Sequence, residues 1–409
     1  MRVCVVGAGA REHALARALS KSATVVVTPG NPGTGRDFEN ASESPEEIDA
    51  DLFVIGPEVP LVDGLADRLR ARGRLVVGPG RDGARLEGSK AWMKEVLARA
   101  AIPSARFESF GADEVPQAIS FLKSLGAPYV IKTDGLAGGK GVLVTPDLDE
   151  AIYDLEGKLS GETFGTAGTR VVVEEFLDGP ELSVMALCDG SRVFGLQPAQ
   201  DYKRVGDNNL GPNTGGMGAY SPVALATPQL VDEVIKSAFE PLVREFNVLG
   251  IDYRGILYGG LIITSAGPKI LEFNIRLGDP ETQVVLPLMA NDLTTILLEV
   301  AQGNLKTWPE FLDQACVGVV MASKGYPQGP LDIGGTIVGI EAAEEDDGVS
   351  VLHAGTTVDS WGNLVSNSGR VLNVTAIGRD LVEARRRAYQ AVAKITWPGV
   401  HFRSDIASF

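Results

Sequence analysis

Residues Lys269–Gln283 read KILEFNIRLGDPETQ, and no other stretch of the chain has so specific a pattern. Side chains of a β-strand alternate between its two faces, so a strand over 269–276 places Glu272, Asn274 and Arg276 on one face, about 6.6 Å apart. The apolar residues between them then face the core. Carboxylate and amide oxygens are ligands of Mg²⁺, and a guanidinium can fork onto a phosphate. The stretch therefore predicts a magnesium and phosphate site, with the solvated face of an edge strand as the alternative.

A glycine-rich loop lies upstream, DGLAGGKGV at Asp134–Val142, between the apolar runs Tyr129–Lys132 and Val142–Thr145. The loop lacks the first glycine and the Ser/Thr of a Walker A motif, and a strand follows it instead of a helix. Two strands joined by this loop predict a hairpin. Because glycines weaken a strand pair, we interpret the tip as a flap over a triphosphate, with Lys140 and Lys132 directed at its charge. A solvated surface hairpin is the alternative.

The segment VVVEEFLDGPELS, Val171–Ser183, predicts a strand that runs into a linker. Linker backbone groups lack ladder partners, so those of Glu175–Leu177 are available to the edge of an adenine, while Glu181 can accept hydrogen bonds from ribose hydroxyls. Without its neighbours the segment is more typical of a core strand and turn. Together with the hairpin and two helices it completes a small α+β unit.

The first hundred residues repeat a short apolar run, a Gly/Pro turn and often a helix. The apolar runs are Val3–Val6, Val25–Val27, Leu52–Ile55 and Leu75–Val77, with helices expected near 12–20, 61–71 and 89–99. Short apolar strands that alternate with helices predict a parallel sheet covered on both faces. Ligands of such sheets bind outside the carboxyl ends of the strands, where the special turns converge.

The first of these turns, GAGAREH at Gly7–His13, is close to a dinucleotide-binding loop but fails its pattern. Glu12 occupies the position of the third glycine, and the second strand ends without an acidic residue for an adenosine ribose, which disfavours a nicotinamide oxidoreductase. Free backbone N–H groups and the helix dipole still favour a phosphate of another ligand, beside Arg11. A purely structural turn is the alternative.

The loop GPNTGGMG, Gly211–Gly218, follows Lys203, Arg204 and Asp207 and can order around a small substrate, with a disordered connection as the alternative. From Ala315 onward the apolar runs again indicate strands, followed by one last helix, and this change of pattern predicts a separate C-terminal domain. Its expected elements are strands at 316–322, 335–340 and 371–377 and a helix at 381–395.

Composition limits the classes of partner. The chain has 409 residues, and 37 Lys and Arg against 53 Asp and Glu give a net charge of −16, which would repel a nucleic acid or an anionic membrane surface. Three scattered cysteines suggest neither a disulfide framework nor a thiolate zinc site. The longest uncharged run, 208–231, is rich in Gly and Pro and cannot be a lipid-buried helix. We expect a cytoplasmic protein that binds neither nucleic acid nor membrane.

The chain resembles the glycinamide ribonucleotide synthetase family of ATP-grasp ligases over essentially its whole length. The resemblance rests on GAGAREH, GPEVPLV (Gly56–Val62), LEGSK (Leu86–Lys90), DGLAGGKGV, VEEFL, DYKRVGD, GPNTGGMGAYSP, EFNIRLGDPETQ and VLHAGT (Val351–Thr356). It implies an α/β fold: an N-terminal doubly wound parallel-sheet domain over 1–101, a central ATP-grasp domain of two α+β subdomains over 102–313, and a small C-terminal α+β domain over 314–409. The unit at about 114–183 would be a lid.

The resemblance also implies an activity and the residues that support it. The activity is ATP-dependent ligation of glycine to 5-phosphoribosylamine through glycyl phosphate, in de novo purine biosynthesis, by a cytoplasmic monomer. Glu272 and Asn274 would bind Mg²⁺ or Mn²⁺, and Arg276, Lys140 and Asp207 would act at the reacting groups. ATP contacts would be Lys90, Lys132, Gly138, Gly139, Lys140, Glu174, Glu175, Phe176, Leu177 and Glu181. Substrate contacts would be Gly7, Gly9, Arg11, Glu58, Asn213, Thr214, Gly215, Gly216, Met217, Asp279 and Thr282.

Two alternatives stay open. Another ATP-grasp enzyme of purine metabolism that activates a carboxylate would share the nucleotide-binding residues, although the chain contains no biotin-attachment sequence and GPNTGGMG favours the glycine ligase. A non-catalytic nucleotide-binding module would bind nucleotide without releasing ADP. The alternating Glu272, Asn274 and Arg276 argue against that module.

Overall fold

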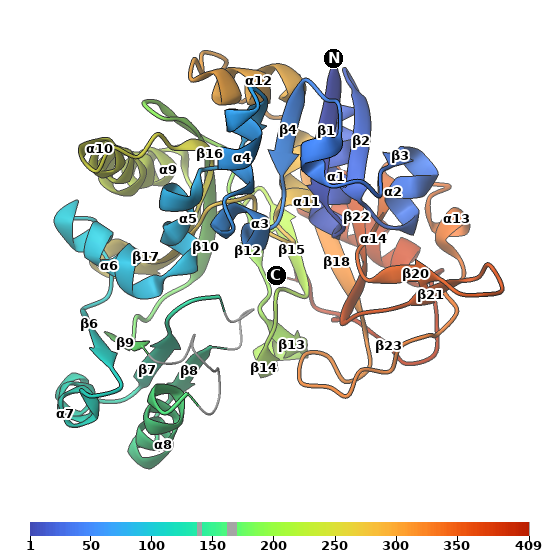
Figure 1. The fold of residues 1–409 in the computed structure, drawn as a ribbon. Coiled ribbons are helices and arrows are strands. Elements are labelled where there is room, and N and C mark those ends of the chain that lie inside the picture. The colour runs from blue at the N-terminus through green and yellow to red at the C-terminus, as the bar shows by residue number, and fades with distance from the viewer. Residues whose placement is uncertain (137–140, 162–169, 409) are drawn as a thin grey trace.

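The computed structural model describes residues 1–136, 141–161 and 170–408, and its first section is a parallel sheet in the order β3-β2-β1-β4-β5 (Figure 1). The strands are β1 (Arg2–Gly7), β2 (Thr24–Pro29), β3 (Glu39–Asn40), β4 (Leu52–Ile55) and β5 (Leu75–Val77). The order reverses at β1, which pairs with β2 on one side and β4 on the other. The turn after β1 therefore opens at the switch point where ligands of such sheets bind.

Helices connect these strands as the apolar pattern predicts, but two further helices form at 32–37 and 81–88, where none is predicted, and the region 58–71 also differs. They are α1 (Ala10–Leu19), α2 (Pro32–Asp37), α3 (Glu58–Val62), α4 (Leu65–Ala71), α5 (Arg81–Gly88) and α6 (Lys90–Arg99). The single helix expected over 61–71 is wrong: the structure has α3 and α4. Gly64 separates them with φ of +79°, a left-handed conformation that ends one helix and that glycine adopts without strain.

A small sheet in the order β6-β9-β7-β8 forms a unit apart from the larger sheets, at the lower left of Figure 1. It comprises β6 (Phe107–Gly111), β7 (Tyr129–Thr133), β8 (Val142–Thr145) and β9 (Arg170–Glu175), with helices α7 (Val115–Leu125) and α8 (Leu148–Leu159). The predicted hairpin of β7 and β8 is confirmed, since the two strands pair antiparallel. The unit has its own apolar core of residues from both helices and the strands.

The second central sheet has the order β11-β10-β16-β17 and is antiparallel. Its strands are β10 (Glu181–Asp189), β11 (Val193–Gly195), β16 (Arg254–Thr264) and β17 (Gly267–Asn274). They are flanked by α9 (Pro228–Val234), a short π-helix over 235–239 and α10 (Glu240–Val248). Pairing passes from Leu261–Ile270 to Gly260–Glu272, so Leu271 is an extra residue in a β-bulge. The strand ends at Asn274, so the expectation that it includes Arg276 is wrong.

The remaining strands form the C-terminal sheet, in the order β12-β15-β18-β22-β19, with β23 paired to β18. These are β12 (Gln200–Asp201), β15 (Gly218–Ser221), β18 (Ala315–Ser323), β19 (Val349–His353), β22 (Arg370–Gly378) and β23 (Val400–His401). Two small hairpins, β13 (Arg204–Gly206) with β14 (Leu210–Asn213) and β20 (Thr356–Val358) with β21 (Leu364–Ser366), lie outside it. The helices are α11 (Thr282–Val285), α12 (Leu293–Gln302), α13 (Ile340–Ala343) and α14 (Leu381–Val392).

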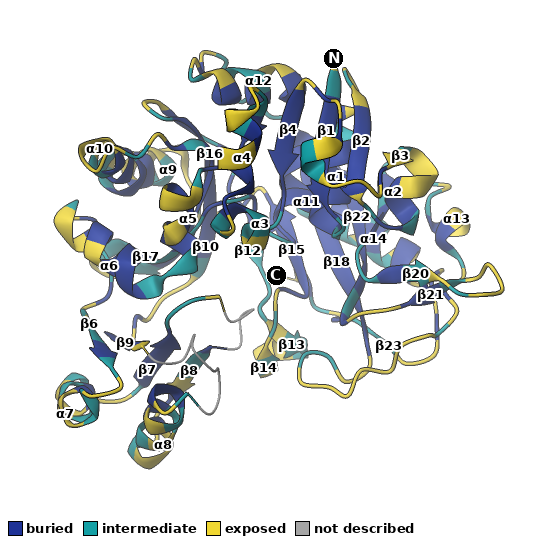
Figure 2. Ribbon diagram, viewed as in Figure 1, coloured by how far each residue is buried: buried dark blue, intermediate teal, exposed yellow. Residues whose placement is uncertain are grey.

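This sheet differs from the sequence prediction, which lacks the strands β19 and β23. No strand forms over 335–340, where Thr336 and Val338 make isolated bridges and Gly339, at φ of +92°, precedes α13. In addition, β12 and β15 join this sheet although they precede residue 313, so the sheet extends beyond the predicted C-terminal domain. Figure 2 shows that the strands are largely buried while exposed residues gather on the outer helices. The α/β fold class is confirmed.

Candidate active site

A cavity of about 400 Å³ lies between α1, α3, α5 and α6 of the first section, the hairpin strand β8, and β17 of the second central sheet. Its lining is dominated by charge. Lys90, Lys203 and Arg276 face it together with Glu58, Glu87 and Glu272. A cavity with this mixture of cations and carboxylates suits a polyanion and a divalent cation held together.

Glu272 and Asn274 lie two residues apart on β17 and both line this cavity, as the alternation predicts. Within the described ranges, no hydrogen bond or ion pair occupies either side chain. Burial raises the pKa of Glu272, but the charges of Lys132, Lys203 and Lys90 more than offset this and hold the pKa below its usual value. The carboxylate is therefore ionised at neutral pH and free for a cation.

Arg276 lies beyond the end of β17 and is held in the cavity by two carboxylates. Its Nη2 donates to Glu87 Oε1 at 2.7 Å, and its Nε donates to Glu58 Oε2 at 3.3 Å. Glu87 also accepts the Ile275 amide at 2.9 Å through Oε2. Burial lowers the pKa of Arg276, but Glu87 and Glu58 outweigh it and raise the pKa above its usual value. The guanidinium is thus permanently charged and its position is fixed from α3 and α5.

Lys132 is connected to a buried carboxylate at the centre of the small sheet. Its Nζ lies 3.1 Å from Glu174 Oε1 and donates to Leu271 O at 3.3 Å, the carbonyl of the bulged residue on β17. Lys94 Nζ, fully buried on α6, lies 3.0 Å from Glu174 Oε2. Burial lowers the pKa of Lys94 to about 8, against the opposing charge of Glu174. Glu174 therefore holds two lysines, and neither it nor Lys132 is part of the cavity lining.

Two further lysines line the cavity itself. Lys90, at the first position of α6, donates from Nζ to Gly135 O at 3.1 Å, and burial lowers its pKa although Glu272 opposes the shift. Lys203 lies 2.8 Å from Asp201 Oδ1 and 3.1 Å from Glu181 Oε2. Burial lowers the pKa of Lys203, but Asp201 and other anions raise it well above its usual value. Both lysines lie within the cluster that holds Glu272 ionised.

The glycines of the turn after β1 have a different function from the one their pattern suggests. A Cβ at Gly7 would lie 2.4 Å from Glu12 Cγ, and one at Gly56 would lie 2.1 Å from Glu12 Oε1. Glu12 Oε2 accepts the Gly9 amide at 2.7 Å, and Oε1 accepts from Arg11 Nε at 2.6 Å. The glycines thus make room for the Glu12 side chain, which fills the space a dinucleotide pyrophosphate would need. This finding supports the rejection of a nicotinamide enzyme.

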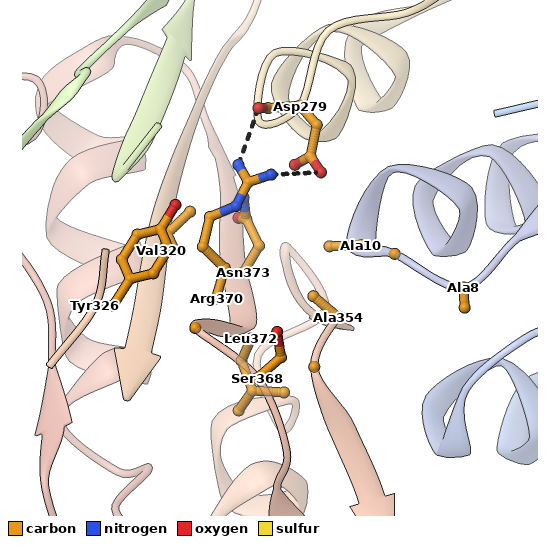
Figure 3. A pocket seen from close by; sticks show the side chains of 13 residues that line it. Ala8, Ala10, Asp279, Val320, Tyr326, Ala354, Ser368, Arg370, Leu372 and Asn373 are labelled. Carbon is orange, nitrogen blue, oxygen red and sulfur yellow. Dashed lines mark hydrogen bonds and ion pairs between the residues drawn. The ribbon is translucent and has the colours of Figure 1, made fainter. Parts of the chain in front are cut away.

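Several predicted site residues do lie in the cavity. Lys90, Glu58, Arg11, Thr214, Gly215, Asp279, Glu272, Asn274 and Arg276 all line it. Gly9 instead lines a second cavity of about 360 Å³, which shares Asp279 and Arg370 with the first (Figure 3). The predicted ATP contacts Gly138, Gly139 and Lys140 lie outside the described residues.

Other predicted residues are not brought into either cavity. Asp207 Oδ1 accepts the Ser404 amide at 2.8 Å, so its carboxylate ties the β13–β14 hairpin to the C-terminal tail. Thr282 Oγ1 donates to Gly278 O inside the protein. Glu175 ends strand β9 and its N–H donates to Arg106 O at 2.9 Å, so the expectation that its backbone lacks a ladder partner is wrong. Its carboxylate pairs with Lys269 at 2.9 Å. The other predicted residues absent from both linings are Gly7, Lys132, Glu174, Phe176, Leu177, Glu181, Asn213, Gly216 and Met217.

Sequence reasoning gave no role to Glu87, Lys94, Asp201 or Arg370, and it named Lys203 only as a residue that precedes the loop Gly211–Gly218. Glu87 and Lys203 lie within the motifs LEGSK and DYKRVGD, so the charged residues of these two motifs were the sequence signal that could have found them. Arg370, from β22, donates to Asp279 O at 2.9 Å and to Asp279 Oδ2 at 3.0 Å. It lies 91 residues away from Asp279, and no local pattern connects the two.

Comparisons with known proteins agree with this architecture. Residues 1–87, 88–282 and 316–409 match the N domain, the ATP-grasp (A) domain and the C domain of phosphoribosylglycinamide synthetase. The chain is 47% identical to the phosphoribosylamine–glycine ligase of Streptomyces coelicolor over 425 aligned positions, which cover 100% of this chain and 99% of that one. It is 44% identical to the Escherichia coli O157:H7 ligase, with 99% and 98% covered.

Solved structures lead to the same family. The crystal structure of the Thermotoga maritima phosphoribosylamine–glycine ligase matches with a TM-score of 0.89 at 37% identity, over 100% of both chains. The biotin carboxylase domain of Hydrogenobacter thermophilus 2-oxoglutarate carboxylase matches with a TM-score of 0.72 at 17% identity, over 98% of this chain and 91% of that one, and shows a shared fold alone. In the described part of the chain no helix is long and apolar enough to cross a membrane. The chain belongs to the phosphoribosylglycinamide synthetase family of ATP-grasp ligases.

Proposed function

We propose that this protein ligates glycine to 5-phosphoribosylamine with ATP, giving glycinamide ribonucleotide, ADP and phosphate in purine biosynthesis. One observation carries the proposal within this family: the oxygens of Glu272 and Asn274, which have no partner among the described residues, face the same cavity as Lys90, Lys203 and Arg276. Such a cavity is built to balance the charge of a triphosphate. The full-length relatives are named phosphoribosylamine–glycine ligase, and we take the two organic substrates from that name.

The donor set fits a magnesium or manganese ion. Glu272 offers a carboxylate and Asn274 an amide oxygen, both hard ligands, and among the described residues no cluster of three or more His, Cys, Asp or Glu competes for a metal. Two protein ligands leave the other positions to phosphate oxygens and water, as Mg²⁺ prefers. When bound, the ion supplies charge neutralisation at the β- and γ-phosphates.

The side chains of the cavity then position and neutralise the reacting groups, and none of them needs to form a covalent bond. The carboxylate of glycine attacks the γ-phosphorus, the bond to the β-phosphate oxygen breaks, and ADP leaves. The amine of phosphoribosylamine then attacks the glycyl carbonyl carbon and loses a proton, and phosphate leaves with one former carboxylate oxygen. We assign Arg276 and Lys90 to the transferring phosphoryl group, because fixed cations cost no reorganisation during the reaction.

The nucleotide side of the site is positioned by three charged residues in contact, Lys132, Glu174 and Lys94. We propose that Glu174 positions Lys132 for the nucleotide phosphates rather than touching the nucleotide with its own carboxylate, since both oxygens face lysines. The linker residues Phe176 and Leu177, together with Glu181, retain the proposed contact with adenosine, whereas the Glu175 N–H already donates to Arg106 O. Lys140, Gly138 and Gly139 complete the phosphate contacts in this proposal.

The small sheet with α7 and α8 is proposed to close over the nucleotide as a lid. Its β8 strand supplies Val142 to the cavity lining, beside Gly141, while its own core is separate from those of the larger sheets. Closure would exclude water from an acyl phosphate, which water otherwise hydrolyses. We further propose that the protein works as a cytoplasmic monomer on small molecules, a setting consistent with three free, buried cysteines.

A coupled assay tests the proposed function. Purified protein with Mg-ATP, glycine and freshly formed phosphoribosylamine should release ADP, and omission of either substrate should reduce the release to background. Replacement of glycine by bicarbonate or formate tests the alternative ATP-grasp reactions. ADP release that depends on one of those anions and not on glycine would contradict the proposal, as would nucleotide binding with no ADP release at all.

A further inference from the structure

One carboxylate in the wall of the active site has no cation partner and no assigned task. Among the described residues, six carboxylates line the nucleotide cavity, the space of about 400 Å³ that also contains Lys90 and Arg276. They are Glu58, Glu87, Asp201, Glu272, Asp279 and Glu281. Glu272 is the proposed metal ligand. Glu281, which immediately precedes α11, forms no ion pair within the described part of the chain.

The other four carboxylates are each held by a cation. The pairs are Asp201 with Lys203 at 2.8 Å, Asp279 with Arg370 at 3.0 Å, and Glu58 and Glu87 with Arg276 at 3.3 and 2.7 Å. Figure 3 shows the Asp279 pair. A cation beside a carboxylate favours its ionised form, so these four are weak proton acceptors.

Glu281 is anchored through only one of its two oxygens. Its Oε1 accepts hydrogen bonds from Ser183 Oγ at 3.0 Å and from Tyr258 Oη at 2.9 Å. Its Oε2 accepts no hydrogen bond from another described residue. A Cβ at Gly278 would lie 2.5 Å from Oε2, so this glycine, which lines the cavity, leaves room for the oxygen. Oε2 is therefore available to a group inside the cavity.

The anchor of Glu281 does not depend on its protonation state. Ser183, on β10, and Tyr258, on β16, come from neighbouring paired strands and direct their hydroxyls at the same oxygen. Oε1 can accept both hydrogens whether or not Oε2 carries a proton. A carboxyl held in this way can take up and release a proton without moving.

The surroundings of Glu281 favour proton uptake. Burial raises the pKa of Glu281 above its usual value, the charge of Asp201 adds to the rise, and Lys203 opposes it. Burial also raises the pKa of Asp279, but cations led by Arg370 outweigh it and hold that pKa below its usual value. A general base works best when its pKa is close to the working pH. Neighbouring carboxylates with opposite shifts have different tasks, and Glu281 suits proton transfer whereas Asp279 suits a fixed charge.

Glu281 is also close to the cations of the reaction. Its negative charge raises the pKa values of Arg276 and Arg370, and both guanidinium groups line the same cavity. Arg276 is assigned above to the transferring phosphoryl group. A proton released during attack on the acyl phosphate is therefore released near Glu281.

We propose that Glu281 is the proton acceptor of the second chemical step, in which the amine attacks the acyl phosphate. The C–N bond forms, the C–O bond to phosphate breaks, and the proton of the attacking nitrogen passes to Glu281 Oε2. Water takes this proton after the products leave. The nitrogen becomes strongly acidic as the C–N bond forms, so a carboxylate is a sufficient base at that stage.

This inference rests on the proposed function for the identity of the amine and of the acyl phosphate. It gives Glu281 no task in the first step, because the glycine carboxylate attacks phosphorus without losing a proton. Loss of the base should therefore slow the second step alone.

Rapid-quench kinetics separates the two steps. Glu281→Gln keeps an oxygen for Ser183 and Tyr258 but cannot take up a proton at neutral pH. With Mg-ATP, glycine and phosphoribosylamine, the variant should form one ADP per active site at the rate of wild type. It should then form glycinamide ribonucleotide about 10²-fold or more slowly than wild type. Hydroxylamine in the quench should trap the accumulated acyl phosphate as glycine hydroxamate, in far larger amounts than from wild type.

Two results of this experiment would overturn the proposal. If the ADP burst is lost and ADP and product form equally slowly, Glu281 acts in the first step, in glycine binding or in folding. If Glu281→Gln forms the product at the rate of wild type, the second step needs no proton acceptor at this position.

The pH profile gives an independent measurement through Ser183, which lines neither cavity. Its hydroxyl stabilises the ionised carboxylate, so Ser183→Ala should raise the pKa of Glu281 and move the acid limb of product formation to higher pH. The control is Ser366→Ala, on β21, which removes a buried hydroxyl that accepts from the Gly335 amide and should leave the limb unchanged. The charged and titratable groups that face Glu281 are Asp201, Lys203, Tyr258, Arg276 and Arg370, and all remain in both variants.

An acid limb at the same pH in Ser183→Ala and wild type would exclude Glu281 as the titrating group. The failure of this inference differs from failure of the proposed function. If wild type shows no glycine-dependent ADP release, the proposed function fails and the role of Glu281 fails with it. If wild type turns over but Glu281→Gln shows no ADP burst, only the role of Glu281 is wrong.

Discussion

Glu87 Oε1 accepts a 2.7 Å hydrogen bond from Arg276 Nη2, and this contact connects α5 to the residues that follow β17. The same carboxylate accepts the Ile275 amide at 2.9 Å, so it fixes both the side chain of Arg276 and the backbone beside it. Burial raises the pKa of Glu87, while Arg276 opposes the rise. The main fixed cation of the site thus depends on a residue of α5.

Loss of this carboxylate should therefore be costly. We expect Glu87→Ala to lower the free energy of unfolding by about 2–3 kcal/mol, because it leaves the half-buried Arg276 with a single carboxylate partner, Glu58, beside the Leu277 carbonyl. Glu87→Gln, which still accepts from Arg276, should lose less stability and retain more activity. Urea unfolding and kcat/KM would check both variants. Equal stability of Glu87→Ala and wild type would show that the pair contributes nothing to folding.

Glu272→Ala should keep the fold and lose activity on the order of 10²-fold or more, because it removes a charged ligand of the proposed metal site. Glu95→Ala, at an exposed position of α6, is the matched control and should turn over normally. Steady-state rates over a series of magnesium concentrations would test this. Near-normal turnover of folded Glu272→Ala at saturating magnesium contradicts the metal assignment.

Lys94 should make stability depend on pH. Its pKa falls from 10.5 in the unfolded chain to about 8 in the folded protein, so the unfolded state binds more protons between these values and stability rises with pH there. Below pH 8 the lysine is protonated in both states. The stability of wild type relative to Lys94→Met should thus be constant up to pH 8 and rise above it, by at most about 1.4 kcal/mol per pH unit. Urea unfolding of both proteins from pH 7 to pH 10 measures the difference, and a constant difference would show that Lys94 titrates normally.

Closure of the proposed lid predicts a change in hydrogen exchange. Peptides that contain Gly141 and Val142, which line the nucleotide cavity, should exchange more slowly with Mg-ATP than without it. Peptides from α14, the helix that packs on the C-terminal sheet, serve as the internal reference and should not change. The lid proposal would be falsified if the amides of 141–142 exchanged equally in both conditions.

An acyl phosphate intermediate predicts the fate of one oxygen atom. Glycine labelled with ¹⁸O in its carboxylate should transfer one labelled oxygen to inorganic phosphate in each turnover, because the amine displaces phosphate together with that oxygen. Adenylation would instead transfer the label to AMP. Mass spectrometry of the phosphate measures the transfer. Label in AMP, or none in phosphate, excludes the mechanism and the roles given to Arg276 and Lys90.

The strand that carries Glu272 and Asn274 shows how far local pattern extends. Alternation correctly placed both side chains on one face, since that periodicity is a property of the extended backbone. It did not predict the bulge at Leu271 or the end of the strand before Arg276. The bulge directs the Leu271 carbonyl to Lys132, a contact between two sheets that no pattern within one strand encodes.

The glycine turn after β1 shows the same limit of local sequence patterns. Its sequence correctly excluded a dinucleotide loop through Glu12, but the reason for its glycines appeared only in the structure, where Gly7 and Gly56 leave space for the Glu12 side chain. The close approach joins the end of β1, the residue after β4 and a side chain of α1. Sequence shows which residues are small, and packing shows what they make room for.

By itself the sequence determined the succession of buried strands and helices, the Glu272–Asn274 face and the motifs of the family, because periodicity and short motifs are local properties of the chain. Only the tertiary structure decided which charges meet. Glu87 holds Arg276 across 189 residues, and Arg370 holds Asp279 across 91. The physical reason is that a local pattern fixes which face of an element is buried, whereas the partner on that face depends on how the sheets pack.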